Sequence, residues 1–416
     1  MRFGARAARG RRLAAHDTLM PQAARRDIRA LFVTGAYHPD ISAGGVQCRD
    51  MARLLAGRVN VRVLTTTWDR TLSRHESVDG VSVTRVAVDV NRRWSKAGAS
   101  VRLIADLVPL VRWCEVVHVQ GTSAKNLLVT AVAKLFRRRL VISLQTAGHD
   151  EPAAIARQGR LAWWAFTAAD AYLAVSPALL DAYLAAGLPR DRITLVPNGV
   201  DTERFRPATD AERQALRHHL HLPDGRSIVA FVGYFSHDKQ PQVLFDAWCR
   251  LLRSGAADAT LLFVGATRSA YFEVDDRIVE RMREEAARIG VSDHLVFTGP
   301  THLVHEYLRA ADVFALPSRR EGAPVALLEA MACGLPCVAS RLPGSTDAII
   351  DDGINGVLVP PGDSDALSAA LEGLLRDRQR SAALAAEARA SVLRRFTSAE
   401  VARCWLSAYR DRKEAA

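Results

Sequence analysis

Short apolar runs alternate with amphipathic stretches along most of the chain, and this alternation constrains the fold more than any other feature. The first series of runs comprises ALFVTG (30–35), VNVRVLTTT (59–67), VSVTRVAVD (81–89), VVHVQG (116–121), LVISLQT (140–146), AYLAVS (171–176) and ITLVPNG (193–199). Helical stretches separate most of these runs. Strands that alternate with helices predict a parallel sheet covered by helices on both faces.

A polar, proline-containing segment interrupts this pattern, and a second series of apolar runs follows it. The second series comprises SIVAFVGYF (227–235), LLFVGAT (261–267), LVFTG (295–299), VFALPS (313–318), PCVAS (336–340) and GVLVP (356–360). The length of 416 residues suffices for two domains. We therefore predict an α/β protein with two Rossmann-like, doubly wound domains, at residues 29–202 and 227–397, joined by a linker at 203–226.

The formal net charge of +11 is concentrated near the N-terminus, where residues 1–29 hold eight arginines against Asp17 and Asp27. This segment has no apolar run, so it predicts neither a signal peptide nor an anchor. We expect residues 1–28 to form a disordered basic tail. Alternatively, translation begins at Met20 and the residues before it are not part of the protein. The alternative is a tether, because basic groups are attracted to anionic lipid. No zinc finger, RNP-like strand or basic helix repeat indicates a nucleic-acid partner.

Cysteine usage and hydropathy indicate the compartment. The six cysteines stand in apolar surroundings, which predicts buried free thiols in a reducing compartment rather than a disulfide framework. Cys333 and Cys337 are close in the sequence but have no second ligand pair, so we expect no zinc site. No run reaches the length of about 18 apolar residues that a membrane-spanning helix needs. We expect a cytoplasmic protein.

Ligands of open parallel sheets bind beyond the carboxyl ends of the strands, so the loops there hold the candidate site residues. The loop HPDISAGG ends in Gly44 and Gly45 directly before a helix. Backbone amides at a helix N-terminus favour phosphate, and glycines allow its close approach, although such a pair is also common in tight turns. In GYFSHDKQP, Lys239 lies at a loop–helix junction, where it either meets a diphosphate or remains solvated. Asp238 beside it can cap the helix.

The most informative segment is LPSRREGAPVALLEAMACGLPCVAS, residues 316–340. Glu321 lies in a loop after a strand, and Glu329 follows inside a helix, about two turns further on. A glutamate within the apolar run ALLEAMA is costly to bury unpaired, so we expect Glu329 to accept hydrogen bonds from hydroxyl groups such as those of a ribose. The backbone amides of Gly322 and Ala323 stand at the helix start and can meet a charged leaving group.

This segment resembles the E-x7-E region of the retaining, nucleotide-sugar-dependent glycosyltransferases of family 4. The resemblance extends over residues 30–409. Its motifs are VTGAYHPDISAGG, VVHVQG, AVSPALL, VPNGVDTERF, VGYFSHDK, AADVFALPS, EGAPVALLEAMACGLPCVAS and DGINGVLVPPGD. The family implies the GT-B fold, in which two Rossmann-like domains face each other across a central cleft. It also implies that a final helix, at 398–416, packs back onto the first domain.

The resemblance assigns roles to the residues identified above. In the family, the residue at the position of Glu329 binds the ribose hydroxyls of the nucleotide. The residue at the position of Glu321 lies at the donor sugar and stabilises developing positive charge. Lys239 would bind the diphosphate, with Gly44 and Gly45 approaching it from the first domain. The implied donor site also includes Gly322, Ala323 and Pro324. The family implies that no metal is used. It also implies that no protein nucleophile is required, because the acceptor hydroxyl attacks on the face that the leaving group vacates.

One departure from the family pattern affects phosphate binding. Tyr234 stands where the family usually has an arginine, and this removes a permanent bidentate donor. Either another basic group compensates or phosphate binding is weaker. Arg319 and Arg320 are the candidate replacements, and a solvated pair is the alternative.

The second departure concerns histidine. Many members carry a histidine after the strand that corresponds to LVISLQT, and here Gln145 occupies that place. His149, four residues later, is our candidate for a catalytic contact with the sugar, or else an exposed loop residue. We expect His118, inside VVHVQG, to be a strand residue rather than a catalytic base.

These features predict a glycosyltransferase that moves a sugar from a nucleotide-sugar donor to a glycan, a lipid-linked saccharide or a small polar acceptor. The acceptor would be recognised by first-domain loops at 38–45, 68–80, 90–100 and 145–160. A basic surface suits peripheral contact with the inner face of an anionic membrane. The alternatives are a non-catalytic nucleotide-sugar-binding or scaffold relative, which Tyr234 favours, and a sugar-nucleotide epimerase of the same architecture.

Overall fold

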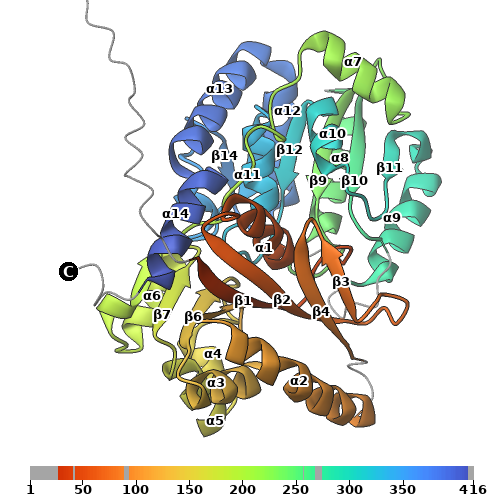
Figure 1. Cartoon of the computed structure of the whole chain (residues 1–416). Coiled ribbons are helices and arrows are strands. Elements are labelled where there is room, and N and C mark those ends of the chain that lie inside the picture. The colour runs from red at the N-terminus through yellow and green to blue at the C-terminus, as the bar shows by residue number, and fades with distance from the viewer. Residues whose placement is uncertain (1–26, 41–42, 89–92, 256, 268–273, 411–416) are drawn as a thin grey trace, which may run out of the picture.

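The computed structural model describes residues 27–40, 43–88, 93–255, 257–267 and 274–410. Residues 1–26, and with them the expected tail or membrane tether, lie outside the described residues. The described chain forms two α/β domains, each built on its own sheet (Figure 1).

The first domain has an eight-stranded sheet in the order β3-β4-β2-β1-β5-β6-β7-β8. Its strands are β1 (Ile28–Thr34), β2 (Val59–Thr67), β3 (His75–Val78), β4 (Val81–Ala87), β5 (Val116–Gln120), β6 (Arg139–Leu144), β7 (Ala171–Ala174) and β8 (Ile193–Leu195). β1 pairs in parallel with β2 on one side and with β5 on the other. The loops after β1 and β5 therefore form the topological switch point of the sheet, where ligands bind in such folds.

Helices cover both faces of this sheet. They are α1 (Ala43–Leu54), α2 (Arg93–Trp113), α3 (Asn126–Leu135), α4 (Pro152–Arg157), α5 (Arg160–Thr167) and α6 (Pro177–Ala185), followed by the 3-10 helix η1 (Arg190–Arg192). Successive residues of β1 point to opposite faces, as in any strand. Leu31 joins the core under α2, α3 and α5, whereas Phe32 joins the core under α1.

The edge strand β3 corrects the prediction of an all-parallel sheet. It runs antiparallel to β4, with His75 opposite Thr84. The connecting turn contains Asp79 and Gly80, whose φ angles are 49° and 80°. An Asp-Gly pair with two positive φ angles is typical of a type I′ hairpin turn, so the dipeptide itself marks this hairpin.

All four loops expected to recognise the acceptor contain regular structure, since α1 already begins at Ala43 within 38–45. β3 lies within 68–80, the backbone of α2 begins within 90–100, and α4 lies within 145–160. Residues 89–92 lie outside the described part of the chain. Fewer loop residues of the first domain are therefore available to recognise an acceptor than the sequence predicts.

The second domain follows the helix α7 (Asp210–His219) and has a six-stranded parallel sheet in the order β11-β10-β9-β12-β13-β14. Its strands are β9 (Ser227–Val232), β10 (Ala259–Val264), β11 (Leu295–Phe297), β12 (Val313–Leu316), β13 (Cys337–Ser340) and β14 (Val357–Val359). Its helices are α8 (Pro241–Arg253), α9 (Asp276–Arg288), α10 (Val304–Ala310), α11 (Val325–Ala332), α12 (Ser364–Arg376) and α13 (Arg378–Arg395), with the 3-10 helices η2 (Ser292–His294) and η3 (Thr346–Ala348).

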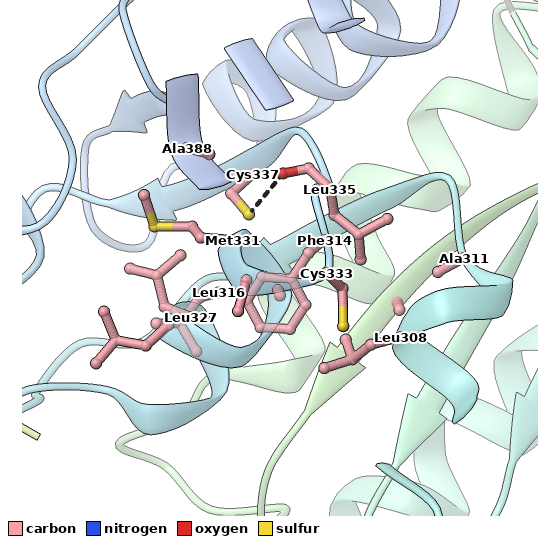
Figure 2. Packing of buried hydrophobic residues seen from close by; sticks show 14 of the residues in the cluster. Leu308, Ala311, Phe314, Leu316, Leu327, Met331, Cys333, Leu335, Cys337 and Ala388 are labelled. Atoms are coloured by element: carbon pink, nitrogen blue, oxygen red, sulfur yellow. Dashed lines mark hydrogen bonds between the residues drawn. The ribbon is translucent and has the colours of Figure 1, made fainter. Parts of the chain in front are cut away.

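One apolar core of the second domain fixes α11 against the sheet. Figure 2 shows Phe314 of β12 and Met331 of α11 within this core. Cys333 and Cys337 lie in the same cluster, and the Cys337 thiol donates to the Leu335 carbonyl oxygen at 3.3 Å. Burial raises the pKa of the Cys333 thiol to about 12. All six cysteines are free, and five of them are buried.

The last helix, α14 (Ser398–Tyr409), returns from the second domain to the first (Figure 1). Val200 and Thr397 form a parallel bridge where the two crossing segments meet. Trp405 and Tyr409 are buried and contact the ring of Phe32 in β1. The C-terminal helix is thus part of the core of the first domain.

Candidate active site

Lys239 and Glu321 meet at the carboxyl edge of the second sheet. Lys239 lies in the loop between β9 and α8, and Glu321 lies in the loop between β12 and α11. Because β9 and β12 are neighbours in the sheet, these two loops lie side by side. The Lys239 ammonium donates to both carboxylate oxygens of Glu321, at 2.6 and 2.8 Å. Glu321 is buried and Lys239 is partly exposed, so a ligand can reach the pair through the lysine.

Glu329 lies half-buried on α11, in the part of the site where the two domains meet. Burial is the main reason that its pKa rises to about 8, with a further contribution from Asp50 on α1 and an opposing one from Arg204. Burial and the nearby Asp201 raise the pKa of Asp50 in turn to about 6. Hydroxyl groups that donate hydrogen bonds to Glu329 would favour its ionised form.

The first domain contributes Gly44 and Gly45 from the first turn of α1. A Cβ on Gly44 would lie 3.8 Å from both Thr34 Oγ1 and Gln120 Cβ, which is ordinary van der Waals contact. The protein's own packing therefore does not require glycine at this position. The space suits a ligand that approaches the N-terminus of α1 closely.

Gly322 makes a tight contact between the domains. A Cβ on Gly322 would lie only 1.9 Å from the carbonyl oxygen of Gln145, so no side chain fits there in this arrangement. The Ala323 carbonyl accepts a hydrogen bond from Asn198 Nδ2 at 2.7 Å. Pro324 directly precedes α11 and has the extended backbone of a helix N-cap. Gly322 and Ala323 thus hold the loop that carries Glu321 against the first domain.

Asp150 organises the first-domain side of the candidate site. It is absent from the residues that the sequence predicts for the site. Its buried carboxylate accepts hydrogen bonds from the amides of Thr122, Gln145 and Thr146 at 2.8, 2.7 and 3.0 Å. His149 Nδ1 lies 3.0 Å from the same carboxylate, and its side chain is 55% exposed. Burial alone would raise the pKa of Asp150, but hydrogen bonds from His149, Thr122 and Gln145 outweigh it and hold the pKa below its usual value. Only its place next to His149 marks it in the sequence.

A row of polar side chains, buried beyond the partly exposed Gln145, connects this side of the site to the C-terminal helix. Gln145 Nε2 donates to Gln120 Oε1 at 2.7 Å, and Gln120 Nε2 lies 3.3 Å from His118 Nε2. His118 Nδ1 lies 2.7 Å from the Tyr409 hydroxyl, and its Nε2 lies 2.8 Å from Ser143 Oγ. Burial lowers the pKa of His118 to about 3. His118 is therefore a buried strand residue that supports Gln120.

The two arginines considered as replacements for the missing arginine at Tyr234 have other contacts. Arg320 forms an ion pair with Asp238. It also faces the first domain, since a Cβ on Gly148 would lie 3.4 Å from Arg320 Nη1. Arg319 is exposed, and its backbone amide donates to the Asp238 carbonyl at 2.7 Å. Lys239 is thus the basic side chain that the structure places directly beside Glu321.

Two family models match the chain. The model described as Glycosyltransferase Family 4 matches residues 44–204, and the model described as Glycosyl transferases group 1 matches residues 212–391. The chain belongs to glycosyltransferase family 4. The two matches divide where the chain passes from the first sheet to the second, and they confirm the family that the sequence motifs resemble.

Named relatives match this family-4 chain over about half of its length. D-inositol 3-phosphate glycosyltransferase from Nocardia farcinica is 38% identical over 198 residues, which are 47% of this chain and 42% of that protein. GDP-mannose-dependent alpha-(1-6)-phosphatidylinositol monomannoside mannosyltransferase from Mycolicibacterium smegmatis is 35% identical over 205 residues, which are 47% of this chain and 50% of that protein. The chain therefore spans about half the length of these relatives.

Solved structures match over nearly the whole chain. Anabaena HepE in complex with UDP and glucose has a TM-score of 0.72 at 20% identity, covering 91% of this chain and 98% of that chain. Sucrose-phosphate synthase from Thermosynechococcus elongatus has a TM-score of 0.75 at 21% identity, covering 94% of this chain and 100% of that chain. These likenesses confirm the GT-B fold that the sequence predicts.

Proposed function

We propose that this protein transfers a sugar from a nucleotide diphosphate donor to a hydroxyl of a glycan, a lipid-linked saccharide or a small polar acceptor, with retention and without a metal. The Lys239–Glu321 ion pair carries the proposal, because it sets a cation suited to a diphosphate beside a carboxylate suited to a sugar. The named relatives support it, since their names specify inositol phosphate and GDP-mannose-dependent transfer. HepE, whose structure includes UDP-glucose, supports a nucleotide-sugar donor.

In the proposed reaction, Lys239 exchanges its contact with Glu321 for one with the donor diphosphate. The exchange leaves the Glu321 carboxylate beside the sugar, where it stabilises positive charge that develops at the anomeric carbon. The bond from this carbon to the diphosphate oxygen breaks, and the acceptor oxygen bonds to the carbon on the same face. The diphosphate takes the proton of the acceptor hydroxyl, so the step needs no protein nucleophile.

The remaining predicted residues hold the donor in place. Glu329 accepts hydrogen bonds from the ribose hydroxyls, and His149, positioned by Asp150, contacts the sugar. The amides around Gly44 at the start of α1 and around Gly322 before α11 meet the diphosphate together with Lys239. Helix N-termini and a lysine supply the positive charge that a metal ion provides in other transferases, which is why we propose a metal-independent reaction.

We further propose that the protein works in the cytoplasm and contacts the inner face of an anionic membrane when its acceptor is lipid-linked. The free cysteines suit a reducing compartment. The net charge of +11 favours anionic lipid. Among the helices of the described residues, none combines the length and the apolar character needed to cross a membrane.

Thermal stabilisation by UDP-, GDP-, ADP- and dTDP-sugars and their free nucleotides tests the donor site. A ligand at 100 times its dissociation constant adds about 2.7 kcal/mol to the stability of the folded state, which is readily seen as a melting shift. A shift with one base should be lost in Glu329→Ala and retained in Glu284→Ala, which changes an exposed glutamate of α9. The absence of a shift with every nucleotide would refute the proposal.

Turnover with candidate acceptors then separates the alternatives. Transfer of the donor sugar with its anomeric configuration retained supports the proposed function. Nucleotide binding without transfer or donor hydrolysis would indicate the binding-only relative, for which Tyr234 is the supporting observation. A donor recovered with one inverted sugar carbon would indicate an epimerase.

A further inference from the structure

The described residues of the first domain line a partly open cavity of about 310 Å³ between α3, α4 and α5. Most of its lining is apolar and includes Leu127, Ile155, Leu161 and Phe166, and its polar groups come from Thr122, Ser123, Asn126 and Gln158. Mostly apolar walls with a few polar groups, around a space of roughly 300–1,000 Å³, are typical of pockets for small molecules. Apart from Thr122, which donates to Asp150, none of these residues has a role in the donor site described above.

The cavity adjoins the candidate active site through one carboxylate oxygen. The Thr122 amide and hydroxyl donate to Asp150 Oδ1 at 2.8 and 2.6 Å. His149 Nδ1 lies 3.0 Å from the same oxygen. A molecule seated in the cavity therefore contacts a residue that shares a hydrogen-bond acceptor with the histidine predicted to reach the donor sugar.

The surface around the cavity is both apolar and basic. Leu161 and Trp164 of α5 are 67% and 43% exposed, which leaves large apolar side chains in contact with water. Arg157 and Arg160 are exposed and flank the lining residues Gln158 and Leu161 in the chain. This combination suits a ligand with a hydrocarbon part and an anionic part.

Charge restricts the occupant further. Residues 121–168 contain seven basic and two acidic residues. Of the two acidic residues, Asp150 is buried, and Glu151 accepts a hydrogen bond from the Gly148 amide at 2.7 Å. No carboxylate of this segment therefore forms an ion pair with Arg157 or Arg160.

We propose that this cavity receives the hydrocarbon chain of an acceptor lipid whose anionic headgroup lies at Arg157 and Arg160. The inference rests on the transferase function proposed above, because a seated chain would hold the hydroxyl of the headgroup near the donor sugar. The apolar walls disfavour a purely polar glycan as the occupant. The exposed arginines disfavour a neutral lipid.

Alkyl phosphates of increasing chain length test the cavity directly. Each methylene removed from water should tighten binding about fourfold, until the cavity is full and the affinity levels off. Binding of 11-bromoundecyl phosphate, below its micellar concentration, is followed by tryptophan fluorescence. Bromine quenches nearby indoles, and Trp163 and Trp164 lie on α5, the helix that supplies Leu161 to the lining. The corresponding alcohol should bind more weakly, because it lacks the charge that the arginines meet.

A pair of matched variants locates the binding. Ala162→Phe places a ring in the cavity lining, and Ala156→Phe makes the same change at an exposed position of α4. We expect the first to weaken binding about tenfold or more and the second to leave it unchanged. If Ala162→Phe lacks a cooperative thermal transition, Leu161→Glu at the exposed part of the lining replaces it and should weaken binding similarly. Equal affinity in the cavity and control variants, or an affinity independent of chain length, would overturn the proposal.

The same variants show which proposal fails if one does. Nucleotide stabilisation is measured on each of them beside alkyl phosphate binding. A retained nucleotide shift with no saturable alkyl binding overturns the lipid cavity alone. Saturable alkyl binding that Ala162→Phe abolishes, without any response to nucleotides, supports the cavity and counts against the proposed transferase.

Discussion

Replacing Gly322 with alanine tests whether catalysis needs the two domains as close as the structure places them. A Cβ on Gly322 would lie 1.9 Å from the Gln145 carbonyl oxygen, and real Cβ atoms essentially never come within 3.0 Å of such a neighbour. The difference between 3.0 and 1.9 Å requires a movement of at least 1.1 Å. Because Glu321 is the adjacent residue, this movement shifts the predicted catalytic carboxylate. A misplacement of about 1 Å can cost about 100-fold in rate, so we expect kcat to fall by roughly that factor.

The assay determines kcat and KM for transfer or donor hydrolysis, together with the melting temperature and the radius of gyration from small-angle scattering. Gly373→Ala is the matched control, because nothing lies within 4 Å of a Cβ added at this position of α12. Alanine for glycine in a helix adds up to about 1 kcal/mol of stability, so the control should be at least as stable as the wild type. A wild-type kcat in Gly322→Ala would refute the reasoning. If the nucleotide affinity of Gly322→Ala falls by the same factor as kcat, the donor loop itself is distorted.

Three further predictions concern groups whose ionisation the structure perturbs. Because burial and Asp50 raise the pKa of Glu329 to about 8, nucleotide affinity should increase by up to about tenfold per pH unit as the pH rises toward 8, and then level off. Calorimetry between about pH 6 and pH 9 measures this, and a slope that persists in Glu329→Gln would assign it to another group. Because burial lowers the pKa of His118 to about 3, the unfolded state binds the proton more readily, and the free energy of unfolding should fall by about 1.4 kcal/mol per pH unit from about pH 6.5 down to about pH 3. Urea titrations of the wild type and His118→Gln, which should show a smaller slope, measure this effect. Asp150→Asn should lower the free energy of unfolding by about 2–3 kcal/mol and also lower kcat, because an amide cannot accept all the hydrogen bonds of the carboxylate. Unchanged stability in denaturant titrations would contradict that account of Asp150.

Most of the fold is predictable from the sequence because the strand pattern is local. The run VNVRVLTTT coincides with β2, since its side chains alternate and its ends are marked by polar or glycine-containing segments. β3 is not predicted by this pattern, because its sequence, HESV, has a single apolar residue. The Asp79–Gly80 turn is its only sequence signal. A short polar edge strand is stabilised mainly by hydrogen bonding to its neighbouring strand. That pairing cannot be predicted from the strand's own residues.

The candidate site is predictable only in part, because its geometry depends on residues far apart in the chain. The motifs mark Glu321, Glu329 and Lys239, and adjacent strands bring Lys239 and Glu321 into contact. The part played by Asp150 depends on amides of two different loops that meet only in the folded sheet. The need for glycine at Gly322 follows from the first domain's backbone. Neither the hydrogen bonds of Asp150 nor this interdomain contact has a local sequence signal.

The ion pair between Lys239 and Glu321 connects these observations to the order of events in the proposed reaction. A buried carboxylate without a partner is costly, so before the donor binds the lysine stabilises Glu321. A diphosphate offers the same lysine at least two negative charges, and the sugar then takes the lysine's place beside the carboxylate. In the proposed reaction, binding of the donor and release of the Glu321 carboxylate from Lys239 are thus one event. The site would hold Glu321 neutralised until the positive charge that it is to stabilise is about to form.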